Sequence, residues 1–212
     1  MKIIEIEQID EYSDNHVDIT KILRAKGYKK LGQGVDQMAF LEPSTGQVLK
    51  IFGTQFNTRG SGGKTFSRDQ KMFFTWAKYC KANKKNPFLP KYSDFTNFVF
   101  DDHTYLQIRM ERLQEIGKLG RNCATAALFV ERNLNFYDID HITAAYIDSG
   151  KDYDDPDIKY LKKRLGKNLD LFIRTIYQVY KMAEDYGWAK DLHHNNFMKR
   201  GNTPVIVDPW VA

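Results

Sequence analysis

The sequence DLHHNN at residues 191–196, followed by VDPW at residues 207–210, decides the fold. The first segment comes directly after residues 168–186, where apolar side chains recur at helical spacing and predict one long amphipathic helix. An aspartate and an asparagine five residues apart on one loop can face the same pocket. A second aspartate follows a short apolar strand and can join them. Asp191, Asn196 and Asp208 are therefore the candidate chemical centre.

Oxygen-bearing side chains of this kind suit magnesium. Mg²⁺ takes oxygen ligands in octahedral geometry and is often held by one or two side chains together with phosphates. Phosphoryl transfer depends on positioning and charge neutralisation more than on covalent chemistry. One carboxylate to orient an attacking hydroxyl, with an amide and a second carboxylate for the metal, satisfies that need. The pattern therefore favours a phosphotransferase.

The two segments DLHHNNFM and VIVDPW together resemble the catalytic loop and the metal-binding segment of the protein-kinase-like superfamily. The likeness is nearest to the branch of aminoglycoside and choline phosphotransferases, whose loops read D-x-H-x-x-N. The resemblance implies that Asp191 is the catalytic base, that Asn196 is a metal ligand and that Asp208 is the principal metal ligand. It also implies ATP and Mg²⁺ as cofactors.

The N-terminal half carries further pieces of the same pattern. LGQG at 31–34 lies between two expected strands and resembles the glycine-rich loop over the ATP phosphates, which would place Gly32, Gln33 and Gly34 at the nucleotide. VLKI at 48–51 resembles the V-A-I-K strand, whose lysine contacts the α- and β-phosphates, and this assigns Lys50. Asp69 opens the next helix where the family has a glutamate, as the ion-pair partner of Lys50.

YLQIRMERL at 105–113 resembles the hinge strand, so backbone groups near Glu111, Arg112 and Leu113 would bind adenine. An ordinary core strand is the alternative there. The pieces occur in the expected order over residues 28–210. They predict an α+β, two-lobed protein-kinase-like fold, with an antiparallel-sheet N-lobe and one main helix in residues 1–112. A reduced helical C-lobe with the catalytic loop and the metal-binding aspartate would occupy residues 113–212.

Periodicity and turn signals predict the individual elements. Strands are expected at 1–7, 28–31, 37–41, 47–52, 95–100, 104–110, 196–198 and 205–207, and helices at 18–25, 66–82, 120–133, 138–147 and 168–186. Residues 53–64 read as a mobile glycine-rich connector, and residues 152–157 as an acidic loop broken by Pro156. We expect the helices between residues 114 and 167 to rebuild part of the lobe, and a kinase-like chain this short favours a phage source.

Composition sets broader bounds. The chain has 212 residues, of which 42% are hydrophobic and 14% aromatic, enough for a sizeable core. No apolar run approaches the roughly 20 residues of a membrane span, and the acidic start is unlike a signal peptide. The only cysteines, Cys80 and Cys123, make neither a disulfide framework nor a zinc site. These features predict a reduced, cytoplasmic protein that does not act at a membrane.

Positive charge is concentrated in residues 59–91, which contain nine Lys or Arg against one acid, Asp69. Such a segment could meet an acidic partner or nucleic acid. No RNA-binding signature or zinc-finger spacing accompanies it, which argues against nucleic acid. A solvated helix face is the favoured interpretation.

Three further motifs allow a functional interpretation, but a structural interpretation is favoured for each. GSGGKT at 60–65 resembles a Walker A P-loop, but that pattern needs glycine at position 58, where the chain has threonine. A flexible basic connector is favoured there. His193 and His194 lack a third ligand at zinc-like spacing, so loop-ordering roles are favoured. Trp210 is favoured as a core anchor over a contact at the metal site.

The favoured function is an ATP- and Mg²⁺-dependent kinase that transfers the γ-phosphate to a protein Ser/Thr hydroxyl, including sites on its own chain. A protein substrate or host partner is favoured over a small molecule. Two alternatives stay open: a pseudokinase-like module that acts by binding a partner protein, and a small-molecule kinase of the aminoglycoside phosphotransferase type.

Overall fold

A computed structural model describes residues 15–33, 37–52, 68–100, 103–152 and 156–211. The chain is α+β, with a five-stranded antiparallel sheet followed by a helical region, as the sequence predicted. It divides into two units. The first contains residues up to Ala82 and Lys91–Arg112, and the second contains Asn83–Pro90 and residues from Leu113 onward. The predicted first lobe included residues 83–90, which the structure places in the second unit.

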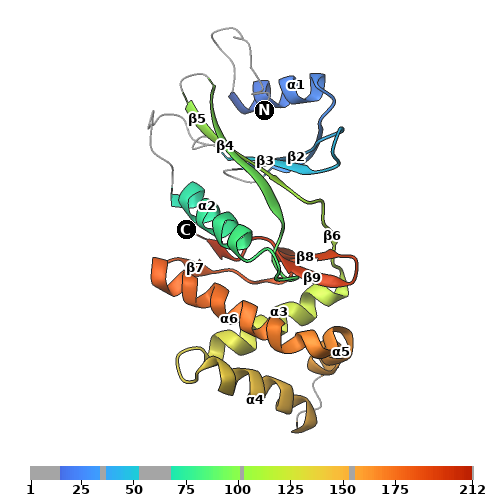
Figure 1. The fold of residues 1–212 in the computed structure, drawn as a ribbon, viewed down its shortest axis with the longest axis vertical. Coiled ribbons are helices and arrows are strands. Elements are labelled where there is room, and N and C mark those ends of the chain that lie inside the picture. Colours follow the sequence, from blue (N-terminus) through green and yellow to red (C-terminus); the bar gives the residue numbers. More distant parts are fainter. Residues whose placement is uncertain (1–14, 34–36, 53–67, 101–102, 153–155, 212) are drawn as a thin grey trace. The chain divides into compact units, whose positions relative to one another are not determined.

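The first unit is the sheet with one helix on each face (Figure 1). Its elements are α1 (Asn15–Ala25), β1 (Lys29–Gln33), β2 (Gln37–Leu41), β3 (Val48–Phe52), α2 (Arg68–Ala82), β4 (Tyr92–Phe100) and β5 (His103–Met110). The strand order is β1-β2-β3-β5-β4, and every neighbouring pair is antiparallel. The two groups of strands expected on either side of α2 therefore form a single sheet, because β3 pairs with β5.

Strand β3 shows how the sequence builds both faces of this sheet. Successive side chains on a strand point to opposite faces. Leu49 and Ile51 are buried with Ile19 and Leu23 of α1 in one hydrophobic cluster. Phe52 faces the other way and stacks on Phe73 of α2, with ring centroids 4.0 Å apart. The alternation therefore lets one short strand serve two cores.

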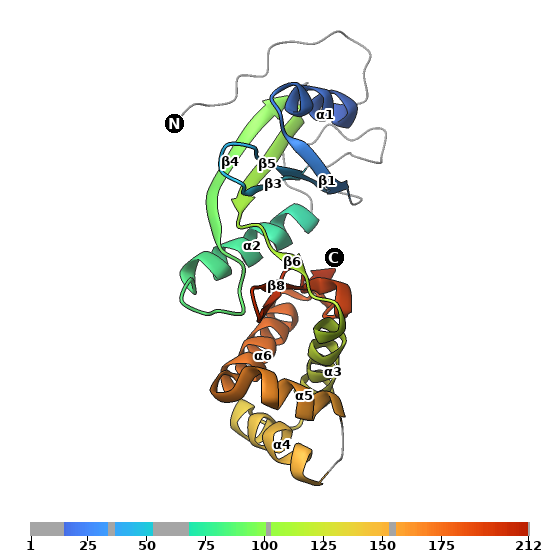
Figure 2. The same ribbon diagram turned by 90° about the vertical axis from the view of Figure 1, so that its right-hand side faces the viewer.

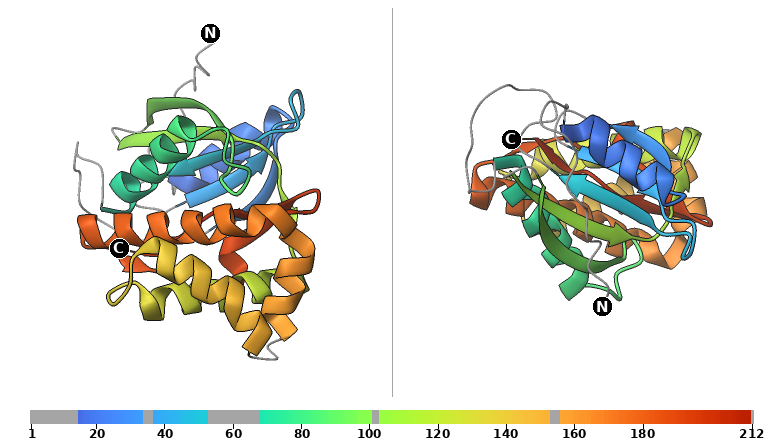
Figure 3. Two further views of the ribbon diagram at one scale, coloured as in Figure 1. Left: turned by 60° about the horizontal axis from the view of Figure 1, so that its bottom comes forward. Right: turned by 90° about the horizontal axis from the view of Figure 1, so that it is seen from above.

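The second unit contains the remaining helices and short strands (Figure 2). They are β6 (Gln114–Glu115), α3 (Lys118–Asn133), α4 (Ile139–Asp152), α5 (Pro156–Leu165), η1 (Gly166–Asn168), α6 (Leu169–Tyr186), β7 (Ala189–Lys190), η2 (His194–Asn196), β8 (Phe197–Arg200), β9 (Thr203–Ile206) and β10 (Trp210–Val211). One small sheet has the order β6-β8-β9, and β7 pairs with β10. Figure 3 shows helices α3 to α6 packed together in this unit.

Helix α6 is the clearest success of the sequence-based prediction. Its apolar positions recur along one face, and Phe172, Ile173 and Ile176 are fully buried. The helix ends at Gly187, whose φ of 66° lies in the left-handed region that favours glycine. The N–H of Trp188 then donates to the carbonyl of Ala183 at 2.8 Å, which closes the helix end. This end positions the chain for β7 and the loop that follows.

The segment Asn83–Pro90 leaves the first unit and anchors in the second. The guanidinium of Arg200 in β8 donates to the carbonyls of Pro87 and Leu89, at 2.9 and 3.0 Å. The N–H of Ile206 in β9 donates to the carbonyl of Phe88 at 2.9 Å. Phe88 is fully buried, and its ring meets Phe172 of α6 edge-on at 5.0 Å between centroids. The segment after α2 thus completes the core of the second unit.

Helix α5 corrects the sequence analysis. Pro156 was expected to break an acidic loop, but it is the first residue of a helix. Proline is well tolerated at this position because its missing N–H would be unpaired there in any case. Asp157 in the first turn then accepts from Asn122 at 2.5 Å and from Thr125 at 3.1 Å, which ties α5 to α3. The expected strand at 1–7 and connector at 53–64 lie outside the described residues.

Two further expectations concern the environment of the chain. No helix among the described residues is long and apolar enough to cross a membrane. Cys80 and Cys123 are both free thiols in the interior, and burial raises the pKa of each. Neither thiol is therefore poised to react.

A buried carboxylate holds together the first unit. Glu42, only 6% exposed, follows β2 and accepts from the Tyr28 hydroxyl at 2.7 Å and from the Thr45 hydroxyl at 2.5 Å. The guanidinium of Arg109 in β5 donates to it at 3.2–3.3 Å. Burial alone would raise the pKa of Glu42, but these hydrogen bonds outweigh burial and leave the pKa below its usual value. The folded unit therefore stabilises the ionised form.

Glu42→Gln should destabilise the protein by about 2–3 kcal/mol, since it removes the charge opposite a largely buried guanidinium. Chemical denaturation measures the change. Asp94→Asn is the matched control: Asp94 approaches the same Arg109 at 3.7 Å but is 62% exposed, so its loss should cost under about 0.5 kcal/mol. Equal effects of the two substitutions would contradict a special role for Glu42.

The same residue predicts a pH dependence. A lowered folded-state pKa means that the stabilisation is complete above the unfolded value, about 4.3 for glutamate, and is lost as the pH falls through the folded value. Wild-type stability should therefore fall more steeply than that of Glu42→Gln below about pH 4.3. Parallel pH profiles of the two proteins would count against this ionisation.

Candidate functional site

Two backbone hydrogen bonds bring the predicted site residues of the second unit together. β7 pairs with β10, and the chain then continues into the loop with the N–H of Asp191 donating to the carbonyl of Pro209 at 2.8 Å. The N–H of Val207 donates to the carbonyl of Asn196 at 3.0 Å. Asp208 lies between Val207 and Pro209, so its two neighbours are bonded to the other two site residues. The three residues are thus held in one place.

The amide of Asn196 is oriented by its surroundings. Its Nδ2 donates to the Asp191 carbonyl at 2.5 Å and to Asp191 Oδ2 at 2.9 Å. Both of these neighbours can only accept, which assigns nitrogen to that side of the amide and leaves Oδ1 on the other. Asn196 is 9% exposed, so this orientation is fixed by a buried setting. Asn196 therefore orients the carboxylate of Asp191 and directs an oxygen elsewhere.

His193 contacts the same two residues. Its Nδ1 lies 2.9 Å from Asn196 Nδ2 and 3.3 Å from Asp191 Oδ1. Its side chain is 48% exposed, and that of Asp191 is 34% exposed. The imidazole thus contacts two side chains of the same loop, and the sequence analysis favoured a loop-ordering role for it. Both carboxylate oxygens of Asp191 have a neighbour, and the group still reaches solvent.

The residues present fit a magnesium ion better than a zinc ion. In the part of the chain that the structure describes, no three His, Cys, Asp or Glu side chains gather as a metal cage. Mg²⁺ commonly takes only one or two protein ligands and completes its shell with phosphates and water. The Oδ1 atom of Asn196 and the carboxylate of Asp208, which is partly buried, form a donor set of that kind. These two side chains are the candidate ligands.

Helix α3 packs against the loop from below at Gly120. A Cβ atom built on Gly120 would lie 3.0 Å from the carbonyl oxygen of His194 and 2.6 Å from Cγ2 of Ile116. Only glycine allows the helix to approach the loop this closely. The extra helical region therefore supports the loop directly, through a residue that the sequence analysis did not single out.

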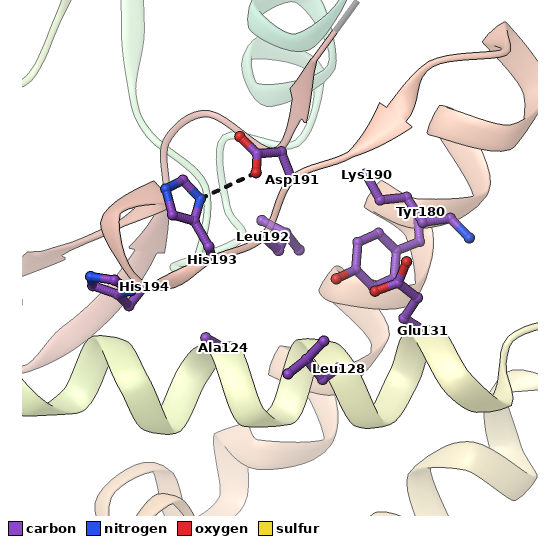
Figure 4. Close-up of a pocket in the computed structure, with 9 residues that line it drawn as sticks. All are labelled: Ala124, Leu128, Glu131, Tyr180, Lys190, Asp191, Leu192, His193 and His194. Carbon is purple, nitrogen blue, oxygen red and sulfur yellow. Dashed lines mark ion pairs between the residues drawn. The ribbon is translucent and has the colours of Figure 1, made fainter.

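A pocket of about 260 Å³ opens beside Asp191 in the second unit (Figure 4). Ala124, Leu128 and Glu131 of α3 form one wall, and Tyr180 of α6 forms another. The loop supplies the remaining lining residues, which are Lys190, Asp191, Leu192, His193 and His194. Asp191 therefore lines a cavity that lies wholly within one unit, and its carboxylate is turned toward His193.

Lys190 and Glu184 fix the chain immediately before Asp191. Lys190 Nζ donates to Glu184 Oε1 at 3.0 Å and lies 5.5 Å from the centre of the Tyr180 ring. Lys181 donates to the other oxygen of Glu184 at 2.8 Å, and these two hydrogen bonds hold the pKa of Glu184 below its usual value. Burial raises the pKa of Tyr180, and the charges of Glu131 and Asp191 add to it.

Trp210 anchors the segment that carries Asp208. It is 2% exposed, its Nε1 donates to the carbonyl of Val179 at 2.9 Å, and its ring lies 5.0 Å from that of Trp188. The prediction of a core anchor is confirmed. Trp210, two residues after Asp208, thus fixes this segment to α6.

The first unit contains the residues predicted to contact the phosphates of ATP. Lys50 lies in β3, and its Nζ sits 5.1 Å from the centre of the Phe73 ring of α2. Asp69 lies one helical turn before Phe73 in the same helix, but its side chain is outside the described residues, as is Gly34. Gly32 follows a register shift in β1, and nothing lies within 4 Å of a Cβ built on it.

The predicted adenine-binding residues span the boundary between the units. The N–H of Glu111 donates to the carbonyl of Lys91 at 3.0 Å, and its carboxylate accepts from the Lys91 N–H at 2.7 Å. Arg112 is exposed and ends the first unit, whereas Leu113 is buried and begins the second. Glu111 thus ties the end of β5 to the start of the β4 segment.

No protein-family model matches this chain. No curated protein matches it either. Among solved structures, the chain is similar to APH(2")-IIa in its ternary complex with streptomycin and ATP. The identity is 14%, the TM-score is 0.28, and the match covers 94% of this chain and 70% of the other. A likeness at this TM-score carries no argument, so the chain's own geometry has to support any function.

Gly120→Ala should destabilise the protein by about 1–2 kcal/mol, because the new methyl group overpacks against the His194 carbonyl and Ile116. In an open helix interior the same change would stabilise by up to about 1 kcal/mol, so even the sign of the effect is informative. Chemical denaturation measures it. Arg121→Ala, at the exposed neighbouring position, is the control and should change stability by under about 0.5 kcal/mol. A stabilised Gly120→Ala protein would show that α3 does not press on the loop.

Proposed function

We propose that this protein is an ATP- and Mg²⁺-dependent phosphotransferase of the protein-kinase-like superfamily that acts on a protein Ser/Thr hydroxyl. The observation that supports it best is the pair of backbone hydrogen bonds that hold Asp208 between Asp191 and Asn196. A base and two metal ligands must stand together for phosphoryl transfer. The order of these residues in the chain, and the loop on which they lie, also agree with the protein-kinase-like pattern that the sequence resembles.

Asp191 is the proposed base. Its carboxylate accepts the proton of the acceptor hydroxyl as that oxygen attacks the γ-phosphorus of ATP. One P–O bond forms to the acceptor, the P–O bond to the β–γ bridging oxygen breaks, and that electron pair leaves with ADP. Asn196 and His193 orient the carboxylate through the contacts at 2.9 and 3.3 Å. The partial exposure of Asp191 leaves room for a hydroxyl to approach.

Asp208 and Asn196 are the proposed magnesium ligands. A bound magnesium ion would neutralise charge on the β- and γ-phosphates. The chain's own contribution is to hold one amide oxygen and one carboxylate in place, through Trp210 on one side and the Asp191 contact on the other.

The proposed nucleotide contacts come from the first unit, apart from Leu113 of the second unit. Lys50 would pair with the α- and β-phosphates, Gly32 to Gly34 would cover them, and Asp69 would pair with Lys50. Backbone groups at 111–113 would bind adenine. Support comes from the elements that carry these residues: a β1–β2 hairpin, a lysine on the third strand, and a helix directly after it. That order is the one the protein-kinase pattern requires.

The pocket beside Asp191 favours a protein acceptor over a large small molecule. Pockets that enclose drug-sized ligands usually measure about 300–1,000 Å³. The cavity here, at about 260 Å³, suits a single side chain or one small ring. A side chain of an acceptor protein, close to the residue that is phosphorylated, fits a cavity of this size.

Incubation with [γ-³²P]ATP and Mg²⁺, with and without cell lysate, tests the activity. Wild type should label a protein band, and Asp191→Ala should reduce the rate by a factor on the order of 10²–10⁴, since general base catalysis contributes about that much. Asp208→Asn should raise the magnesium concentration needed for half-maximal rate. Asp185→Ala, at an exposed position nearby, should leave the rate unchanged.

Labelling that persists in Asp191→Ala would sink the assignment of the base. Intact nucleotide binding by wild type without transfer to any protein or small molecule would favour the pseudokinase-like binding module instead. Transfer to amino sugars but not to protein would favour the small-molecule kinase.

Lys50→Ala should weaken ATP binding about tenfold or more, because it removes a charge-assisted contact to phosphate worth roughly 1.5–3 kcal/mol. Lys64→Ala should leave ATP binding unchanged, because the Walker-A-like GSGGKT segment lacks its first glycine. Isothermal titration with a non-hydrolysable ATP analogue measures both. The reverse result would replace the kinase-like site with a P-loop.

A further inference from the structure

The pocket beside Asp191 has a second carboxylate that the transfer reaction does not use. Glu131 projects from α3 on the side of the pocket near Tyr180, as Figure 4 shows. Within the described part of the chain, no hydrogen bond or ion pair holds its side chain. We propose that this pocket receives a lysine or arginine side chain of the acceptor protein, next to the hydroxyl that is phosphorylated. The inference rests on the proposed function, and Glu131 becomes its specificity-determining residue.

The wall of the pocket suits the stem of such a side chain. Ala124 and Leu128 lie on α3 on the same side as Glu131, at intervals of one helical turn or less. Leu128 is 50% exposed and offers apolar surface at the pocket, and Leu192 adds apolar surface from the loop. Long basic side chains bury their methylene groups on apolar surface while the charged head reaches a polar partner. The pocket has an apolar wall followed by a carboxylate, which matches a side chain with an apolar stem and a charged head.

The charges in the pocket favour a cation at this position. Burial raises the pKa of the Tyr180 hydroxyl, and the negative charges of Glu131 and Asp191 raise it further, so this side of the pocket is negatively charged. Lys190 is the cation among the lining residues, and its ammonium group is held by Glu184 at 3.0 Å. An incoming ammonium or guanidinium group would therefore meet a carboxylate that has no other partner among the residues that the structure describes.

The size of the pocket suits one side chain. A volume of about 260 Å³ is enough to hold the side chain of a lysine or arginine. Asp191, the proposed base, lines the same pocket. A basic residue bound here therefore belongs to the same short peptide segment as the acceptor hydroxyl. The recognition would appear as a preference for Lys or Arg at a fixed position relative to the phosphorylated residue.

An arrayed library of Ser/Thr peptides, with each residue type placed in turn at every flanking position, tests this with [γ-³²P]ATP and Mg²⁺. Wild type should favour Lys or Arg at one position. Glu131→Gln should lower kcat/KM for the favoured peptide by roughly twofold to fivefold, the effect of one partly exposed charge pair. For the matching peptide with alanine at that position, the two enzymes should be equal. Glu131→Lys should shift the preference to Asp or Glu.

Glu115→Gln is the matched control, because Glu115 is exposed in β6 of the same unit and does not line the pocket. It should keep the wild-type preference. Asp191-dependent transfer without any basic preference, or with a preference that survives Glu131→Gln, would overturn the inference and leave the kinase proposal standing. Transfer to ethanolamine or amino sugars but to no peptide would overturn the inference that the cation in the pocket belongs to a protein. Absence of all transfer, with nucleotide still bound, would overturn the inference and the proposed function together.

Discussion

The site depends on two backbone hydrogen bonds that join the loop to the segment after β9. One runs from the N–H of Asp191 to Pro209, and the other runs from the N–H of Val207 to Asn196. Each is worth only about 1 kcal/mol net, but their effect is geometric. Because they involve main-chain atoms, they fix where three side chains emerge without using any of those side chains. The carboxylates and the amide stay available for chemistry.

The surrounding elements can be understood as supports for that arrangement. Helix α6 ends at Gly187, and the chain continues into β7. Trp210 in β10, the strand that pairs with β7, donates a hydrogen bond to α6. Helix α3 closes on the loop through Gly120. Side chains on two helices therefore surround a short irregular loop, and packed elements hold it in a single conformation. A loop with polar side chains that face inward needs this support, since unpaired buried polar groups are costly.

Much of this arrangement was readable in the sequence, for reasons that are local. The apolar repeat of α6, the glycine that ends it and the alternation around Lys50 in β3 are patterns within one element. The roles of Gly120, Glu131 and Glu184 could not be predicted from the sequence. Each role depends on a neighbouring residue that lies far away in the chain or on another helical turn. The helix at Pro156 was missed since a proline that starts a helix and a proline that interrupts a loop look alike in sequence. The predicted site residues of the two units stay predictions.

The detour of residues 83–90 has a consequence for how the polypeptide is made. The chain passes from one unit to the other at 82–83, 90–91 and 112–113, so no single cut separates the two. Pro87 and Leu89 leave the ribosome 113 and 111 residues before Arg200, which binds their carbonyls. At about 5–20 residues per second, Phe88 and Leu89 wait on the order of ten seconds for the strands that cover them. During translation, Phe88 and Leu89 therefore stay uncovered until these strands are made, and the second unit can close only after β9 has emerged.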